Sequence, residues 1–233
     1  VAFQMFPFAE SLEQPSVSPD GLTSDGYLNS AKWKQVGRFW HDVNNKDEIH
    51  PKGLTTDETL PFFQAGNAAL FVAGAQYQDQ LGPMSEQGEM DLDVAPHPYF
   101  EGGRRVNTSG SWAMGIGRNS EKQDAATEFI RFYTGPEGSK LWTKITGRPA
   151  TFAAREDQLN NPENRKFPAA TKLLAVYESD RFGVSRPKTV GYLELEAVVT
   201  STCADIRNGA DPDKALENAV TVLDRQLEKY RRR

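Results

Sequence analysis

The sequence has a single cysteine among its 233 residues, Cys203, so no disulfide can form within the chain. Cys203 lies in a helical pattern and is predicted to be a small core residue. No run of apolar residues approaches the ~20 that cross a bilayer as a helix. Residues 1–3 also lack the basic start of a signal peptide. The fold therefore has to rest on a hydrophobic core, for which a hydrophobic content of 38% is adequate.

Positive charge and histidine are scarce too. The chain has 27 basic and 32 acidic residues, a net charge of −5, so it lacks the basic face of a nucleic-acid-binding protein. Its histidines, at positions 41, 50 and 97, are far apart in sequence, and no metal site is predicted. The glycines at 115 and 117 lack the rest of a phosphate-binding fingerprint, so no cofactor is expected.

The parts of a catalytic site are missing as well. No Gly-x-Ser-x-Gly turn accompanies a histidine. Glu194 and Glu196 could form a carboxylate pair, but side chains two positions apart on a helix point apart. The sequence therefore predicts that the protein is not an enzyme. A hydrolase on a related scaffold and an interaction module without a small ligand remain the alternatives.

Residues 107–150 show the clearest organisation that is present. Glycines flank a short apolar strand predicted over residues 111–116. Ser120 and Gln123 have the spacing of a capping box before a helix at residues 125–133. Gly135-Pro136 predicts a break before a second helix. These elements resemble half of an α/β lobe.

Other segments are assigned from their patterns. Helices are predicted after Ser30, over residues 57–64, 75–81 and 192–207, and from Pro212 onward, with Asp211 as the last cap. A buried strand is predicted over residues 68–72, and another at residues 1–9, leading into a helix or a loop. Residues 14–26, rich in Pro, Ser, Asp and Gly, are predicted to be a surface loop.

Four stretches resemble the extracellular solute-binding proteins of ABC importers, in particular the carbohydrate-binding class that includes the maltose-binding proteins. They are FFQAGNAALFVAGAQY (62–77), the glycine strand and A-x-E-F-x-x-F run (110–133), GRPA (147–150) and the ending at 186–227. The resemblance implies a type II periplasmic-binding-protein-like α/β fold with two lobes. It also implies that this chain is a C-terminal portion of a longer protein, with its N-terminal lobe incomplete.

On that resemblance, residues 1–96 form the first part of the C-terminal lobe. Residues 97–150 belong to the N-terminal lobe, and residues 151–233 form the second part of the C-terminal lobe. The solute, most simply a sugar or oligosaccharide, would bind between the lobes and be delivered to the membrane subunits of an ABC transporter. The location would be periplasmic or extracellular, with a lipid anchor at the missing N-terminus as one possibility.

Eight residues are candidates for solute binding. Trp112, with Ser111 and Gly110 beside it, offers an aromatic face in a glycine-flanked strand, and aromatic faces suit the apolar faces of sugars. Gln76 and Tyr77 follow a predicted strand, where α/β folds bind ligands. Arg148 lies in a turn predicted to face the cleft. The resemblance adds Tyr192, at a helix start, and Phe8.

Overall fold

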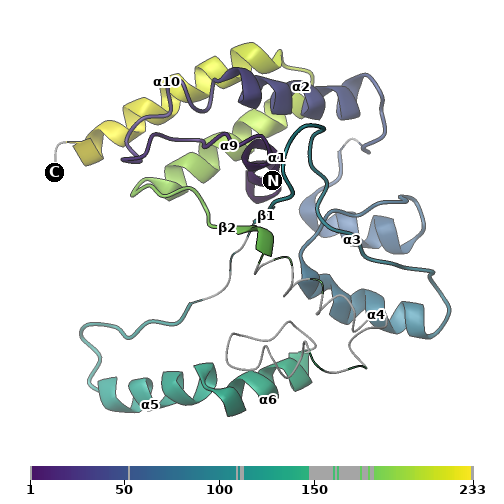
Figure 1. Cartoon of the computed structure of the whole chain (residues 1–233), viewed down its shortest axis with the longest axis vertical. Coiled ribbons are helices and arrows are strands. Elements are labelled where there is room, and N and C mark those ends of the chain that lie inside the picture. The colour runs from purple at the N-terminus through teal and green to yellow at the C-terminus, as the bar shows by residue number, and fades with distance from the viewer. Residues whose placement is uncertain are drawn as a thin grey trace. The chain divides into compact units, whose positions relative to one another are not determined.

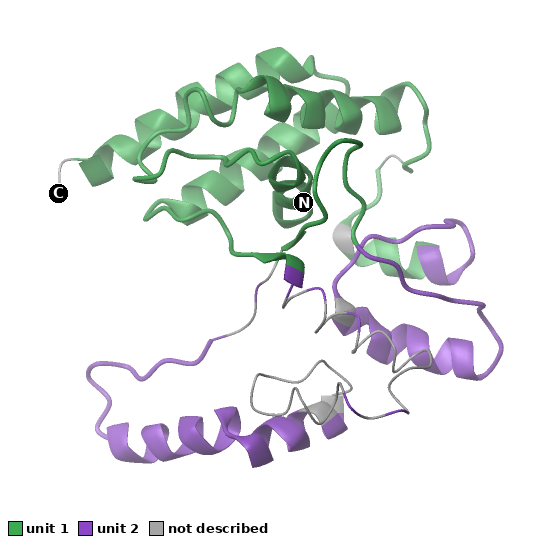
Figure 2. Ribbon diagram, in the orientation of Figure 1, with its two compact units in different colours: residues 1–62, 97–109, 182–233 green, residues 63–96, 110–181 purple. Residues whose placement is uncertain are grey.

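The computed structural model describes residues 2–51, 53–108, 110, 113–146, 160, 162, 174, 178 and 181–231. The chain divides into two compact units (Figure 2). Unit 1 comprises Val1–Phe62, His97–Ser109 and Phe182–Arg233, and unit 2 comprises Phe63–Pro96 and Gly110–Arg181. Each unit is therefore assembled from segments that are distant in the sequence.

The core of unit 1 lies among α1 (Ala2–Ser11), α2 (Ala31–Asn45), α9 (Tyr192–Arg207) and α10 (Pro212–Arg231). Helix α9 contacts the other three, and α10 also packs along α2 (Figure 1). Cys203 is buried in this core, as predicted. The cluster also includes Met5, Phe6, Leu28, Trp33, Val36, Leu195, Val199, Leu216, Leu223 and Leu227.

Local signals set the ends of these helices. The Ser30 hydroxyl accepts a hydrogen bond from the backbone N–H of Trp33 at 3.2 Å, so Ser30 caps α2 as predicted. Asp211 likewise accepts from a first-turn N–H of α10 at 2.9 Å, and Pro212 takes the first helical position. Helix α9 ends just before Gly209, whose φ of +100° suits glycine.

Residues 14–26 form a loop, as their composition predicts, with residues 15, 19, 20, 25 and 26 exposed, but part of this loop is buried. They fold against α10, with Ser24 fully buried and Val17 5% exposed. The Asp224 carboxylate on α10 accepts hydrogen bonds from the Thr23 hydroxyl at 2.5 Å and from the Ser24 N–H and hydroxyl at 2.6 and 2.7 Å. Because these bonds satisfy the buried polar groups, a polar sequence can lie inside the unit.

The opening of the chain also differs from its prediction. The structure has helix α1 where a strand is predicted over residues 1–9, because a short apolar run does not distinguish the two by periodicity. Strand pairing in the described part of unit 1 consists of β1 (Asn107–Thr108) and β2 (Gly183–Val184). They run parallel, with Asn107 opposite Gly183.

The described residues of unit 2 form helices joined by turns and irregular segments. Helix α3 (Thr56–Gln64) enters the unit from unit 1, and η1 (Ala75–Tyr77) leads into α4 (Gln78–Glu86). Helix α5 (Gln123–Thr134) is followed directly by α6 (Pro136–Thr146), so the predicted break at Gly135-Pro136 is confirmed. None of the described helices combines the length and apolar character needed to cross a bilayer.

Two strand predictions in unit 2 are wrong for the described residues. Residues 68–72 and 113–116 are irregular and belong to no sheet. Residues 111 and 112, the start of the second predicted strand, lie outside the described residues. A strand forms through hydrogen bonds to a neighbour, and the described residues give these two segments none.

The predicted capping box of α5 is also wrong. The helix begins at Gln123, and the residue before it, Lys122, makes no side-chain cap bond. The Ser120 hydroxyl accepts from the Lys122 N–H at 3.2 Å, and the Gln123 amide donates to the Arg118 carbonyl at 2.8 Å. Both polar side chains stabilise the turn that precedes the helix.

Candidate functional site

In unit 1, an arginine lies against two aromatic rings at the start of α9. The guanidinium carbon of Arg186, which follows β2, is 5.2 Å from the ring centroid of Phe3 and 5.4 Å from that of Tyr192. The Tyr192 hydroxyl donates a hydrogen bond to Glu196 Oε1 at 3.2 Å, one turn further along α9. Helix α1, the segment after β2 and helix α9 thus bring a cation, two ring faces and a carboxylate together.

The start of α9 is held firmly on the end of α10. The Glu194 carboxylate accepts hydrogen bonds from the Lys229 ammonium and, at 3.0 Å, from the Tyr230 hydroxyl. A Cβ at Gly191 would overlap the side chain of Leu227 and lie 3.2 Å from the Tyr230 ring. Glycine at this position therefore permits the close approach that places Tyr192.

The electrostatics keep the Tyr192 phenol protonated. Burial first, and then the negative charge of Glu196, raise the pKa of Tyr192 above its usual 10.0. At neutral pH the phenol is thus a hydrogen-bond donor, Glu196 is an acceptor, and Arg186 is a fixed donor. As the sequence predicts, Glu194 and Glu196 point to different partners.

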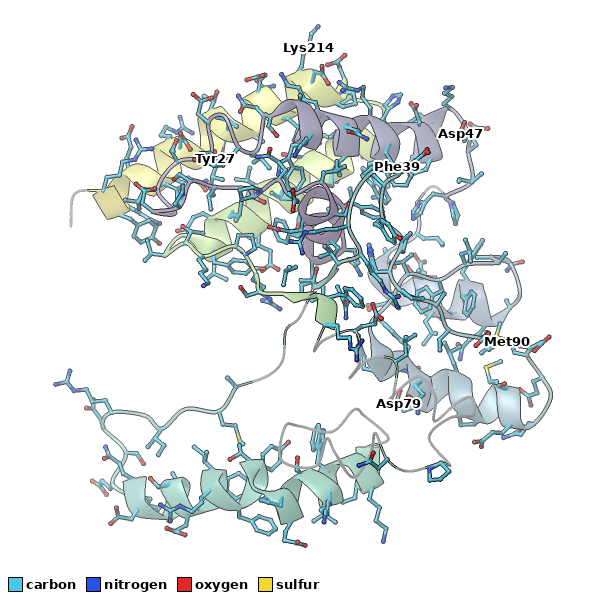
Figure 3. The ribbon with its side chains drawn as sticks, in the orientation of Figure 1. Tyr27, Phe39, Asp47, Asp79, Met90 and Lys214 are labelled. Carbon is cyan, nitrogen blue, oxygen red and sulfur yellow. The ribbon has the colours of Figure 1, made fainter. Side chains whose placement is uncertain are left out.

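Phe8 lies in a cluster of rings within unit 1. Its ring centroid is 4.9 Å from that of His97, 5.3 Å from that of Phe39 and 5.8 Å from that of Phe100. Phe39, labelled in Figure 3, is still 36% exposed. Burial lowers the pKa of His97, whose Nε2 is buried without a hydrogen-bond partner. Phe8 thus packs among rings, with a neutral imidazole on one side.

In unit 2, Tyr77 ends a row of three aromatic rings. The rings of Phe63 and Phe71 stack with centroids 5.2 Å apart, and Phe71 meets Tyr77 edge to face at 5.2 Å. Gln76 is exposed, and its carboxamide fills the space that a Cβ at Gly74 would occupy. The structure therefore places an amide and an aromatic ring side by side on η1.

The remaining candidates are described only in part. Gly110, in unit 2, is exposed. Ser111, Trp112 and Arg148 lie outside the described residues, so their predicted roles stay predictions. The structure adds Phe3, Arg186 and Glu196 to the candidates, and sequence reasoning missed them. The one local signal in the sequence is the Arg186-Pro187 pair. No sequence pattern links the three residues, because they come from separate segments of the chain.

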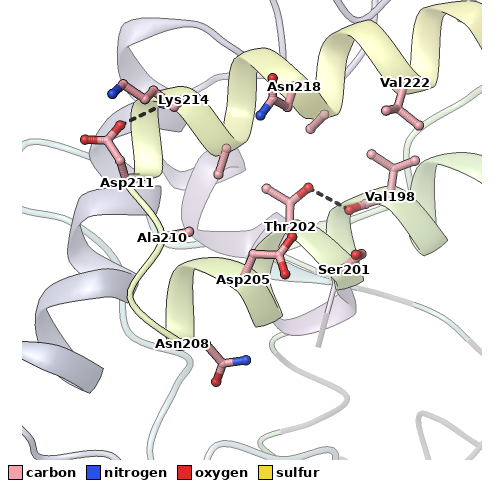
Figure 4. Close-up of a pocket in the computed structure, with 12 residues that line it drawn as sticks. Val198, Ser201, Thr202, Asp205, Asn208, Ala210, Asp211, Lys214, Asn218 and Val222 are labelled. Atoms are coloured by element: carbon pink, nitrogen blue, oxygen red, sulfur yellow. Dashed lines mark hydrogen bonds between the residues drawn. The ribbon is translucent and has the colours of Figure 1, made fainter.

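A groove of about 490 Å³ lies between α9 and α10, and none of these candidates is among its lining residues (Figure 4). Val198, Ala219 and Val222 form its apolar surface, and Asp205 and Lys214 lie on its rim. Figure 3 shows Lys214 pointing outward from α10. In the described part of the chain, no group of three or more His, Cys, Asp and Glu is placed to hold a metal ion.

Comparison with known structures identifies the fold. A solute-binding protein of an ABC transporter from Thermotoga lettingae, bound with α-D-tagatose, superposes with a TM-score of 0.80 at 16% identity. A maltose/maltodextrin-binding domain from Bdellovibrio bacteriovorus, bound to maltotriose, gives 0.75 at 20%, and a maltose-bound protein of T. maritima gives 0.73 at 20%. These matches cover 97%, 97% and 98% of this chain but 56%, 57% and 57% of the relatives.

The chain thus spans little more than half the length of the relatives that it matches. The predicted fold class, a type II periplasmic-binding-protein-like fold, is confirmed by these superpositions. The family model for bacterial extracellular solute-binding proteins independently matches residues 8–140, more than half of the sequence. The chain belongs to the bacterial extracellular solute-binding protein family.

Proposed function

We propose that the complete protein binds a mono- or oligosaccharide between two lobes and delivers it to the membrane subunits of an ABC importer. The arrangement of Arg186 between Phe3 and Tyr192, with Glu196 accepting from the phenol, is the observation that carries the proposal. Sugars present apolar faces and many hydroxyls, which need ring faces and paired donors and acceptors. The solutes named for the structural relatives are sugars, which agrees with this chemistry.

The full candidate site of the proposal includes the residues predicted from the sequence. Tyr77 and Gln76 supply a ring and an amide, and Tyr192 supplies a ring and a donor. Trp112, Ser111, Gly110, Arg148 and Phe8 complete the set. We retain the predicted lobe assignment as part of the proposal, with residues 97–150 in the N-terminal lobe and residues 1–96 and 151–233 in the C-terminal lobe.

The proposal involves no bond making or breaking. The only thiol of the chain, Cys203, is 5% exposed, and burial raises its pKa to about 12. It is therefore not a nucleophile at neutral pH. The ring of His41 contacts its neighbour Asp42, through Nδ1 and Oδ1 at 3.1 Å. The proposed binding function gives this histidine no catalytic role.

The family is one of extracellular proteins, so the proposed location is the periplasm or the cell exterior. A lipid anchor on another part of the complete protein is compatible with this location. The proposed partner is the permease of an ABC importer, and nucleic acid is not a partner of this acidic chain.

The test is calorimetric titration of the complete gene product that contains this chain, with α-D-tagatose, maltose and maltotriose. We expect at least one of these sugars to bind. Arg186→Ala should weaken binding at least tenfold, about 1.4 kcal/mol, because hydrogen bonds from a charged donor contribute about that much or more. Tyr192→Phe, which keeps the ring, should weaken it less.

Arg38→Ala is the matched control. Arg38 is an exposed arginine of the same unit, paired with Asp213 at 2.7 Å, and its loss should leave sugar affinity unchanged. Wild-type affinity in Arg186→Ala would remove this arginine from the site. Binding of an amino acid or phosphate, with none of the sugars bound, would overturn the carbohydrate assignment while keeping the fold.

A further inference from the structure

The chain returns from unit 2 to unit 1 at His97 and then lies against α1. The His97 ring meets the ring of Phe8 with centroids 4.9 Å apart. Further along, the Arg104 backbone N–H donates a hydrogen bond to the Ser11 carbonyl at 2.8 Å. Residues 97–104, here called the return segment, are thus attached to α1 near both of their ends.

The hydrogen bond of His97 fixes where its ring carries a hydrogen. Nδ1 lies 2.8 Å from the Pro98 carbonyl oxygen, which can only accept, so Nδ1 bears the hydrogen and donates. Nε2 of the neutral ring then holds a lone pair. This nitrogen is buried and has no hydrogen-bond partner among the described residues. His97 therefore packs as a neutral imidazole with a bare nitrogen in the interior.

The surroundings of the His97 ring are aromatic. Phe8, which it contacts, also meets Phe39 and Phe100, with centroids 5.3 and 5.8 Å away. Burial lowers the pKa of His97 below its usual 6.5, and the bond to the Pro98 carbonyl only partly opposes this. In the described part of the chain, no carboxylate acts on the ring.

The charged groups of the neighbouring elements are engaged elsewhere. Burial raises the pKa of Glu10 on α1, and the charge of Arg104 opposes this. Arg104 also lies 3.8 Å from Glu13. Glu101 and Tyr99 of the return segment are exposed. The charged residues of α2 have their own partners: the Leu12 carbonyl for Lys32, Glu217 for Lys34, Asp213 for Arg38 and Asp42 for His41.

Protonation of the packed His97 ring has a definite cost. It would place an N–H group and a charge where neither has a partner, a cost that a ring in water does not bear. The packed ring therefore takes up a proton less readily than an exposed one. The attachment that it provides is complete above pH 6.5, the usual pKa, and is lost as the pH falls through the lowered pKa of the packed ring.

We propose that His97 is an acid-sensitive anchor, which holds the return segment on α1 while its ring is neutral and releases it when Nε2 takes up a proton. Histidine is the side chain that ordinarily titrates between about pH 5 and 8. Because the family is one of extracellular proteins, the anchor responds to the pH of the surrounding medium. The proposal does not depend on which solute the protein binds, so it and the sugar titration can fail separately.

Hydrogen–deuterium exchange of the complete gene product at about pH 7.5 and about pH 5 is the primary test. After correction for the intrinsic exchange rate, protection of the Arg104 amide should fall about fivefold or more in the acid sample. His97→Asn should remove most of this fall, because an Asn amide can still donate to the Pro98 carbonyl but takes up no proton. Glu10 and His50, whose pKa values burial also shifts, are present in both proteins. An equal fall in both would overturn the proposal.

His41→Asn is the matched control. The His41 Nδ1 faces the Asp42 carboxylate at 3.1 Å, which can accept from a protonated ring, so this variant should keep the wild-type pH dependence of Arg104 protection. Loss of that dependence in His41→Asn as well as in His97→Asn would mean that His97 is not the anchor.

Nitrogen NMR of the His97 ring in the wild-type protein tests the same proposal without a substitution. The spectra should show a hydrogen on Nδ1 and a pKa below 6.5. A hydrogen on Nε2, or a His97 pKa of 6.5 or above, would contradict the proposal even if His97→Asn fails to fold.

Discussion

The two units are built from similar amphipathic helices but differ in what those helices bury. Leu195, Leu223 and Leu227 of unit 1 are fully buried, whereas Phe129 and Ile145 of unit 2 are 57% and 73% exposed. Periodicity in a sequence states which face of a helix is apolar. Whether that face is covered depends on a second element that packs against it. In unit 1 the helices cover one another, whereas the described part of unit 2 leaves Phe129 and Ile145 exposed.

Truncation of matched residues in the two units should show the largest difference. Leu223→Ala leaves a cavity in a closed core and should cost about 2–5 kcal/mol of unfolding free energy. Phe129→Ala removes a ring that is largely in water and should change stability by about 0.5 kcal/mol or less in this chain. Urea unfolding followed by circular dichroism measures both. Equal losses would abolish the distinction between the units.

A glycine pair tests how tightly the segment of residues 14–26 closes unit 1. Gly21 and Gly26 have φ of +71° and +76°, but a Cβ on Gly21 would lie 2.5 Å from the Lys188 carbonyl oxygen and 2.9 Å from the Thr189 Cα, whereas Gly26 faces open space. Gly21→Ala should cost about 2–3 kcal/mol, and Gly26→Ala about 1–2 kcal/mol from backbone strain alone. Thermal unfolding of the two variants separates the cost of steric overlap, which only Gly21→Ala carries, from the cost of backbone strain, which both carry. Identical midpoints would mean that the close approach is not maintained in solution.

A third test concerns the Asp224 carboxylate. Burial acts to raise the pKa of Asp224, but hydrogen bonds from Thr23 and Ser24 outweigh it and lower the pKa below the usual 3.8. Asp224→Ala should therefore cost about 1–2 kcal/mol at neutral pH, after allowance for partial exposure.

The pH dependence of this effect has a definite sign. Because the pKa is lower in the folded state, the stabilisation is complete above pH 3.8 and disappears as the pH falls through the lowered value. The exposed Asp213, paired with Arg38, provides the control and should have little effect when changed to alanine. A difference between wild type and Asp224→Ala that does not decrease as the pH falls below 3.8 would contradict the assignment to ionisation.

Much of unit 1 could be predicted because its signals are local. The Ser30 cap, the Asp211-Pro212 start and the Gly209 stop act within one helical turn, so the sequence alone indicates them. The prediction of a surface loop at residues 14–26 missed its buried part, because Asp224, about 200 positions away, accepts hydrogen bonds from the buried Ser24. The helix at residues 2–11 was misassigned because packing, not periodicity, selects it.

Strands and the candidate site were harder for the same physical reason. The apolar residues 68–72 predict a strand, but pairing requires a partner that the described residues lack. Tyr192 could be placed at a helix start from its neighbours. Phe3 and Arg186, which lie against it, come from opposite ends of the sequence and meet through tertiary packing.

The routing of the chain has a consequence for the order in which the protein folds. Unit 1 joins residues 1–62 to residues 182–233, and α9 and α10, which are synthesised well after α1 and α2, supply Leu195, Leu223 and Leu227 to its core. During synthesis, α1 and α2 must therefore wait for nearly 150 further residues before their apolar faces are covered. Contacts of such long sequence separation slow folding, so the nascent chain keeps an open hydrophobic surface until α9 and α10 emerge.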